Sequence, residues 1–351
     1  MLLAKRFANA IFRRTDLGQT TPITHCFLYT PGLTHRFVIH PMELIRGLHN
    51  LRPRHRGCAI TVGAFDGIHR GHQAVLAHLR DKAGELGVPS VVIVFEPLPR
   101  EYLRPLEAPP RVTNFRERVE ALAETGIDRL LVLRFDETMR TSSAQGFVQS
   151  IFVDALGARY IALGDDFRFG NRREGDFEYI RQLAETYGYE VQRTPTLELH
   201  GERVSSTRVR KVLELGDFCT AEKLLGRPFT MKGKVVYGRQ LGRQIGTPTA
   251  NIRINRIRSP LSGVYAVRVD GPGLVQAAGV ANVGVRPTIE EGLTANLEVH
   301  LLGQQCELYG ERLTVRFVSK LREEMKFDSL DALKAAISHD KHQALEVLAQ
   351  Q

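Results

Sequence analysis

The hydrophobic pattern of this chain changes once, near residues 225–229. Upstream, from about residue 58, short apolar runs alternate with segments of helical spacing, as in the run at 90–95 and the amphipathic segment at 71–86. This alternation indicates a parallel sheet with helices on both faces. Downstream, short alternating segments are separated by Gly, Pro and Asp, which is typical of an antiparallel β-barrel. Ser329 then stands where it could cap a C-terminal helix.

The change of pattern predicts two domains, at 42–225 and 226–351, which suits a length of 351 residues. Residues 1–41 form an N-terminal extension without sustained helical or strand periodicity. Five basic residues and one acidic residue in this extension contribute +4 of the net charge of +9. Its basic opening resembles a transit peptide, but it lacks the apolar core of a signal peptide. We expect instead a misassigned start codon, with Met42 as the true beginning.

Composition excludes several classes of protein. An apolar content of 43% and a charged content of 25% are ordinary for a globular chain, and no apolar run reaches the roughly 18 residues of a membrane-spanning helix. The four cysteines occur singly, without CxxC spacing, which fits a reducing cytoplasm. A pI near 9.5 favours anionic partners, either nucleic acid or phosphorylated small molecules. Because Trp is absent and the basic excess lies largely in residues 1–41, we expect no nucleic-acid partner.

The segment GAFDGIHRGH, residues 63–72, joins the first apolar strand to the next helix. In a parallel sheet this carboxyl edge is where ligands bind, and a helix N-terminus there attracts anions. His69 and His72 are three residues apart, so on a starting helical turn they can face the same anion. The alternative is a glycine-rich turn with two solvated histidines. Three glycines in this segment would let the backbone approach a phosphate closely: Gly63, Gly67 and Gly71.

A second segment, residues 203–216, places hydroxyl side chains at the start of a predicted helix. Arg208 and Arg210 lie in its first turn, where a cation is unfavourable unless an anion is present. This conflict points to a bound phosphate, although a capped surface helix with solvated arginines is the alternative. The hydroxyl side chains are those of Ser205, Ser206 and Thr207.

The motifs of the predicted first domain resemble those of a known enzyme family. GAFDGIHRGH resembles the HxGH signature of the nucleotidyltransferase superfamily in the form found in bacterial FAD synthetases. GDDFRFG (164–170) and SSTRVR (205–210) resemble later motifs of that family in order and spacing. The similarity to bifunctional riboflavin kinase/FMN adenylyltransferases runs from about Met42 nearly to the C-terminus.

The resemblance implies a Rossmann-like nucleotidyltransferase domain in which the FMN phosphate attacks the α-phosphorus of ATP, giving FAD and pyrophosphate. His69 and His72 would stabilise the transferring phosphoryl group, with Arg210 as a further catalytic residue on the triphosphate. The other residues that it assigns to nucleotide or substrate are Gly63, Phe65, Asp66, Gly67, Gly71, Asp166, Phe167, Ser206 and Thr207. One departure is Leu98, which stands where the family often has the His of a Pro-His-Pro motif, so any phosphate contact from that histidine is missing. Arg100 could substitute for it or be a solvated loop charge.

The second domain opens with a glycine-rich segment, residues 232–252, that lacks a Walker motif. Thr247, Thr249 and Asn251 offer the oxygen ligands that Mg²⁺ prefers. On spacing alone this segment is equally compatible with a flexible β-hairpin. The string GTPTAN (246–251), followed by SGVYAV, NVGVRPT and LEVHLL, closely resembles the riboflavin kinase module.

The second resemblance implies a six-stranded antiparallel β-barrel with a C-terminal helix. Thr249 and Asn251 would bind Mg²⁺ and ATP, and Glu298 would be the catalytic base. The remaining nucleotide contacts would come from Gly238, Arg243 and Gly246. A base is needed here because the acceptor is a ribityl hydroxyl with a pKa near that of water, about 15.7.

The sequence therefore predicts an enzyme of the α/β plus β class that phosphorylates riboflavin to FMN and adenylylates FMN to FAD. ATP is the co-substrate of both steps, and Mg²⁺ is expected at both sites. The alternative is another HxGH nucleotidyltransferase with a different acceptor, which gives no reason for the barrel. We expect a cytoplasmic monomer or weak oligomer, with riboflavin, FMN and ATP as partners and with neither nucleic acid nor membrane.

Overall fold

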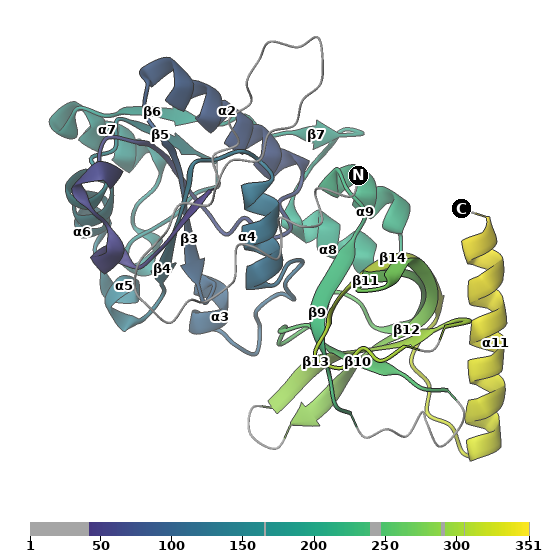
Figure 1. The fold of residues 1–351 in the computed structure, drawn as a ribbon. Helices are drawn as coiled ribbons and strands as arrows, with labels where there is room; N and C mark the ends of the chain where they lie inside the picture. The colour runs from purple at the N-terminus through teal and green to yellow at the C-terminus, as the bar shows by residue number, and fades with distance from the viewer. Residues whose placement is uncertain (1–41, 165, 239–246, 289–291, 305, 351) are drawn as a thin grey trace, which may run out of the picture. The chain divides into compact units, whose positions relative to one another are not determined.

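The computed structural model describes residues 42–164, 166–238, 247–288, 292–304 and 306–350 (Figure 1). The predicted N-terminal extension at 1–41 lies outside these residues, as do Arg243 and Gly246 of the predicted kinase site. Among the described residues, no helix is long and apolar enough to cross a membrane.

The first half of the described chain forms a parallel sheet of six strands in the order β1-β4-β3-β2-β5-β6. The strands are β1 (Glu43–Arg46), β2 (Ala59–Val62), β3 (Ser90–Glu96), β4 (Arg129–Arg134), β5 (Tyr160–Leu163) and β6 (Glu190–Arg193). The helices around them are α2 (Arg70–Leu86), α3 (Pro99–Leu103), α4 (Phe115–Ala123), α5 (Glu137–Thr141), α6 (Ala144–Phe147) and α7 (Phe177–Tyr187). A wider helical segment, η3 (Val148–Ala155), continues α6, and short 3-10 turns occur at η1 (Leu48–Asn50), η2 (Pro53–His55) and η4 (Asn171–Arg173).

Alternate residues of the central strands face two separate apolar layers. Ile60 of β2 packs in a layer with α6, η3 and α7, whereas its neighbour Ala59 packs in a layer with α2 and α4. Successive side chains of a strand point to opposite faces, so a strand buried on both sides must be apolar throughout. The predicted sheet with helices on both faces is therefore confirmed.

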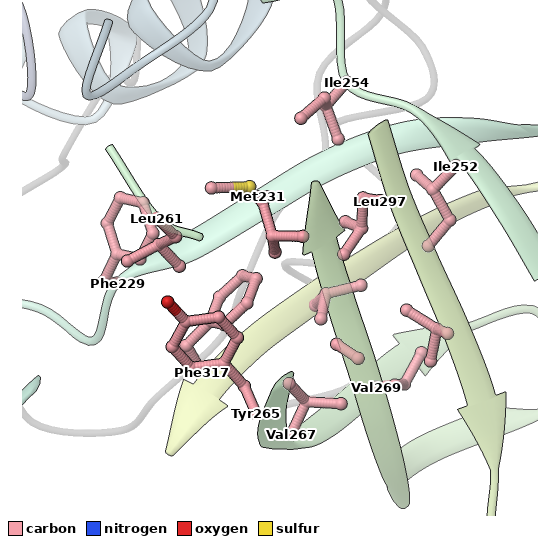
Figure 2. Close-up of a cluster of buried hydrophobic side chains, with 14 of the residues drawn as sticks. Phe229, Met231, Ile252, Ile254, Leu261, Tyr265, Val267, Val269, Leu297 and Phe317 are labelled. Atoms are coloured by element: carbon pink, nitrogen blue, oxygen red, sulfur yellow. The ribbon is translucent and has the colours of Figure 1, made fainter. Parts of the chain in front are cut away.

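The second half forms a closed barrel whose neighbouring strands are all antiparallel, in the order β10-β13-β12-β11-β14-β9. Its strands are β9 (Thr230–Val236), β10 (Ala250–Arg253), β11 (Gly263–Gly271), β12 (Leu274–Thr288), β13 (Gly292–Leu301) and β14 (Arg312–Arg322). Alternate side chains point inward and meet in one apolar core, as Figure 2 shows for Met231, Tyr265 and Phe317. The predicted six-stranded antiparallel barrel is confirmed.

Two helices near the predicted domain boundary pack on the barrel. They are α8 (Ser206–Glu214) and α9 (Phe218–Leu225), which follow the two-stranded hairpin β7 (Glu198–Leu199) and β8 (Glu202–Arg203). Phe218 stacks on Phe317 with ring centroids 5.9 Å apart and meets the edge of Tyr265. The barrel core is thus continuous with α8 and α9, although the sequence pattern changes at residue 225. The division at residue 225 stays a prediction.

Polar contacts at the start of α4 join it to the barrel. Asn114 and Glu117 form a capping box, in which each side chain accepts the backbone N–H of the other residue. The same Glu117 carboxylate accepts the backbone N–H of Lys232 at 2.7 Å and pairs with Arg256 at 2.5 Å. The Asn114 amide donates to the carbonyl oxygen of Ile254 at 3.0 Å. One helix terminus therefore serves both as a cap and as an attachment point for the barrel.

The C-terminal helix α11 (Leu330–Ala349) begins as predicted, since the Ser329 hydroxyl accepts the backbone N–H of Ala332. Figure 1 shows it along the outside of the barrel, where Ala344 and Leu348 pack against β11. Asp340 is buried and forms a bidentate ion pair with Arg322 of β14, with N–O distances of 2.9 Å. This pair fixes the helix to the barrel wall.

We predict that Asp340→Ala lowers the free energy of unfolding by about 3–5 kcal/mol, because it leaves the Arg322 guanidinium without its buried partner. Urea denaturation followed by circular dichroism measures this loss. The matched control is Asp331→Ala in the first turn of the same helix, whose exposed carboxylate is worth no more than about 1 kcal/mol. Equal losses for the two variants would contradict the anchoring role of Asp340.

Candidate active sites

The Gly-rich turn, residues 63–72, leaves the carboxyl end of β2 and enters α2 at Arg70. Its backbone is strained, since Phe65 and Ile68 have φ values of 46° and 39°. Gly67 has a φ of 85°, and a side chain there would lie 2.9 Å from Val112. Strain of this kind persists only where the surrounding contacts fix the backbone, and it gathers at functional sites.

The two histidines of the turn lie side by side. Their rings stack with centroids 3.7 Å apart and planes 17° apart. His69 caps α2, because its Nδ1 accepts the backbone N–H of His72 at 3.2 Å. With Nδ1 acting as an acceptor, the proton of a neutral His69 sits on Nε2. The Nδ1 atom of His72 is buried and has no hydrogen-bond partner in the described part of the chain.

Both imidazoles are held neutral at physiological pH. Burial lowers the pKa of His69 to about 4, against the opposing charge of Asp66 and with a further lowering from the nearby Arg203 and Arg210. Burial also lowers the pKa of His72 well below its usual value, and the adjacent His69 adds to this effect. Each ring therefore offers one N–H donor to an anion rather than a full positive charge.

Asp66 organises the turn from within. Its side chain is 2% exposed, and its carboxylate accepts the backbone N–H groups of Val112 at 3.0 Å and Thr113 at 2.9 Å. Arg210 pairs with the same carboxylate at 2.7 Å. Asp66 thus connects three segments of the chain, and its assignment to nucleotide or substrate stays a prediction.

Helix α8 begins at Ser206, and its cap is Ser205, as the sequence predicts. The Ser206 hydroxyl donates to the carbonyl oxygen of Asp66 at 2.9 Å, and Thr207 is exposed beside it. These contacts bring the second motif against the Gly-rich turn.

The two arginines of α8 have partners within the chain. Arg208 pairs with Glu202 at 2.9 Å, and Arg210 donates to the carbonyl oxygen of Pro110 at 2.7 Å in addition to pairing with Asp66. The unfavourable charge at the helix start is thus relieved without a phosphate. The assignment of Ser206, Thr207 and Arg210 to the triphosphate stays a prediction.

The loop residues 166–170 also approach this region. Phe167 stacks on the buried Phe169 with centroids 5.3 Å apart, and the exposed Asp166 lies 3.3 Å from the guanidinium of Arg203. Arg203 also acts electrostatically on His69, so this cation belongs to the site. Sequence reasoning did not single it out, although it directly precedes the Ser-rich helix start.

The strand end that carries Leu98 is organised by a buried arginine. Leu98 occupies the N-cap position of the short helix α3, where its backbone N–H donates to the Glu101 carboxylate at 3.1 Å, and Arg100 is exposed. Arg118 of α4 donates to the carbonyl oxygen of Ala64 at 3.0 Å and pairs with Glu96 at 2.6 Å. It thereby joins the ends of β2 and β3, a role that no sequence signal indicated.

The predicted kinase residues meet on the barrel. Asn251 of β10 lies opposite Glu298 of β13, and Glu298 lies opposite Asn282 of β12. These three residues, which we term the polar row, cross three adjacent strands. The Oδ1 atoms of Asn251 and Asn282 are buried and have no hydrogen-bond partner among the described residues. Asn282 opens the string NVGVRPT of the riboflavin kinase resemblance, but sequence reasoning assigned it no role of its own.

A close backbone approach at Gly238 and a lysine of the C-terminal helix also lie at this site. Gly238 lies so close to Asn251 that a side chain there would be 2.3 Å from its amide nitrogen. Thr249 is half-buried at the start of β10. The ammonium group of Lys341 on α11 donates to the hydroxyl of Thr247 at 3.1 Å. No group of three or more His, Cys, Asp or Glu side chains that could hold a metal occurs in the part of the chain that the structure describes.

Comparison with known proteins matches both halves of the chain. A family model described as FAD synthetase covers residues 51–208, and one described as riboflavin kinase covers residues 225–348. A bifunctional riboflavin kinase/FMN adenylyltransferase from Pseudomonas fluorescens is 54% identical over 299 residues, which is 85% of this chain and 96% of the relative. The enzyme of the same description from Escherichia coli (strain K12) is 45% identical over 306 residues, with coverages of 87% and 97%.

A solved structure shares the architecture. The crystal structure named as a macrolide-efflux protein from Streptococcus pneumoniae superposes with a TM-score of 0.68 at 30% sequence identity, covering 86% of this chain and 98% of that one. The fold and the two family matches define a two-domain flavin-nucleotide transferase. The chain belongs to the family of bifunctional riboflavin kinase/FMN adenylyltransferases.

The lowered pKa of His69 predicts a pH dependence of stability. The unfolded histidine takes up a proton near pH 6.5, whereas the folded one does so only at about pH 4. This contribution is therefore complete above pH 6.5 and is lost as the pH falls towards 4, with a total of about 3 kcal/mol. Urea denaturation of the native protein and of His69→Gln across this range should show a weaker pH dependence in the variant. An NMR titration midpoint of His69 near 6.5 would contradict the account.

Proposed function

We propose that the barrel phosphorylates riboflavin to FMN and that the N-terminal domain adenylylates FMN to FAD, each step using one ATP. The observation that carries this assignment is the presence of two separate polar sites. One consists of neutral imidazole donors on a Gly-rich turn, and the other contains a carboxylate on a barrel strand. An HxGH enzyme with a different acceptor would leave the second site without a role.

At the Gly-rich turn, the chemistry requires donors rather than a base. A phosphate monoester has its second pKa near 6, so FMN arrives largely as a dianion that can attack the α-phosphorus directly. The barrier lies in the charge that builds on the transferring phosphoryl group. His69 Nε2–H, fixed by the capping bond of Nδ1, can donate to this charge with little reorganisation. His72 is stacked beside it and adds a second donor.

At the barrel, the chemistry requires a base. The ribityl hydroxyl must lose its proton as it attacks the γ-phosphorus of ATP. Glu298 is half-buried and receives a hydrogen bond from the Asn296 amide at 3.0 Å, which orients its carboxylate. Its place between Asn251 and Asn282 puts a proton acceptor within a row of polar side chains.

The oxygen atoms at the polar row fit Mg²⁺. The buried Oδ1 of Asn251 lacks a hydrogen-bond partner among the described residues, and such an atom is costly unless a ligand satisfies it. Thr249 and Asn251 would hold the ion, which when bound would neutralise charge on the ATP phosphates. From the sequence we also propose a cytoplasmic enzyme that acts as a monomer or weak oligomer on small molecules only.

Separate sites predict opposite effects of two substitutions. His72→Ala should slow FAD formation from FMN by about 10²–10³, the usual cost of one preorganised donor, and leave FMN formation nearly intact. Glu298→Ala should do the reverse. Both rates are measured on the same preparation, with flavins separated by chromatography.

The matched control for the first variant is His78→Ala, further along α2, whose ring bonds to the Tyr160 hydroxyl rather than facing the turn. It should change neither rate by more than about 2-fold. If His72→Ala and Glu298→Ala each abolished both steps in a folded protein, the assignment of independent sites would be wrong.

A further inference from the structure

We propose that Arg256, a residue of the barrel domain, is a positioning residue for adenylyl transfer in the other domain. This inference rests on the proposed function of the Gly-rich turn. Arg256 lies shortly after β10, on the chain segment that leaves the kinase site. Among the described residues its side chain has no polar contact with one that we assign to substrate, and it acts through the segment 110–114.

The Arg256 side chain is fully buried and reaches out of the barrel. Its guanidinium donates to the carbonyl oxygens of Val112 at 2.9 Å and Arg111 at 3.3 Å, and it pairs with Glu117 at 2.5 Å. These partners all belong to the N-terminal half of the chain. The planar fork of an arginine suits this geometry, because it can reach two carbonyl oxygens and a carboxylate at once.

Val112 links Arg256 to the Gly-rich turn. Its carbonyl oxygen accepts from Arg256, while its backbone N–H donates to the Asp66 carboxylate at 3.0 Å. Thr113 strengthens this link, because its hydroxyl accepts the backbone N–H of Gly67 at 3.0 Å. A direct series of hydrogen bonds therefore runs from the barrel to the strained turn that bears His69.

A second contact holds the same turn from the barrel side. Arg227, just before β9, donates to the carbonyl oxygens of Gly67 at 2.8 Å and Ile68 at 3.2 Å. The strained backbone around Ile68 is thus fixed by residues on both sides. Strained backbone persists only while the surrounding contacts hold it. Loss of the contacts made through Arg256 or by Arg227 should therefore displace His69 and His72.

The size of the expected effect follows from geometry. A misplacement of about 1 Å at a reacting centre can cost about 10²-fold in rate. Within the described part of the chain, the polar contacts of the Arg256 side chain are with Arg111, Val112 and Glu117 and not with the polar row of the kinase site. Its backbone oxygen accepts from Ala295 whatever the side chain is. Substitution should therefore slow FAD formation and spare FMN formation, although the residue lies in the barrel.

The test is Arg256→Lys, which keeps a positive charge beside Glu117 but cannot bridge two carbonyl oxygens and a carboxylate. We expect kcat for FAD formation from FMN to fall about 10- to 100-fold. The KM for FMN and the kcat for FMN formation should stay within about 2-fold. The matched control is Arg258→Met. Arg258 lies two residues away and also reaches from the barrel to the N-terminal domain, where it donates to the carbonyl oxygens of Leu106 and Ala108. These two residues, both within the described chain, do not bind Asp66. Arg258→Met should leave both rates unchanged.

A second variant covers the case in which Arg256→Lys fails to fold. Arg256→Met combined with Glu117→Gln removes both buried charges, and the same split between the two activities is expected. Equal loss of both activities, or an unchanged kcat for FAD formation in folded Arg256→Lys protein, would overturn the proposal. Failure of the native protein to form FAD would instead overturn the proposed function, so the two failures are distinguishable.

Discussion

The buried ion pair between Arg256 and Glu117 is the contact on which the two halves of the molecule depend. Charges of this kind are expensive to bury unless hydrogen bonds compensate them. Here the carboxylate also closes the capping box of α4 and accepts a backbone N–H from β9. The guanidinium in turn holds Val112, whose backbone N–H donates to the Asp66 carboxylate of the Gly-rich turn. One charged pair therefore sets the start of a helix, the edge of the barrel and the position of the Gly-rich turn.

The two sites differ because their acceptors differ in acidity. A phosphate dianion is already a nucleophile, so the Gly-rich turn supplies neutral N–H donors, and burial keeps its imidazoles uncharged. A hydroxyl must lose a proton, so the barrel supplies a carboxylate between two Asn side chains. Both proposed sites share the need to compensate phosphate charge, which a Gly-rich backbone and a helix N-terminus would meet in one case and the proposed oxygen ligands for Mg²⁺ would meet in the other.

Local patterns were readable in the sequence, whereas long-range polar contacts were not. The apolar strands, the Ser329 cap and the pairing of His69 with His72 follow from spacing over a few residues, and the structure bears them out. Strands β1 and β6 were missed because they lie at the edges of the sheet and are only partly buried, unlike the equally short but fully buried β2 and β5. Strand β10 was missed because it lies within a Gly-rich segment. Arg118 and Arg256 were missed for another reason. Their partners lie far away in the chain, and a lone Arg ordinarily indicates a solvated position.

In this protein one site makes FMN, which is the substrate of the other site. The most direct test of this account is a time course of the native protein with riboflavin, ATP and Mg²⁺, with the flavins resolved by chromatography. The account predicts that FMN appears first, that FAD follows after a lag, and that adding FMN directly abolishes the lag. Riboflavin that stays unchanged, or FMN that accumulates and is never converted, would contradict it.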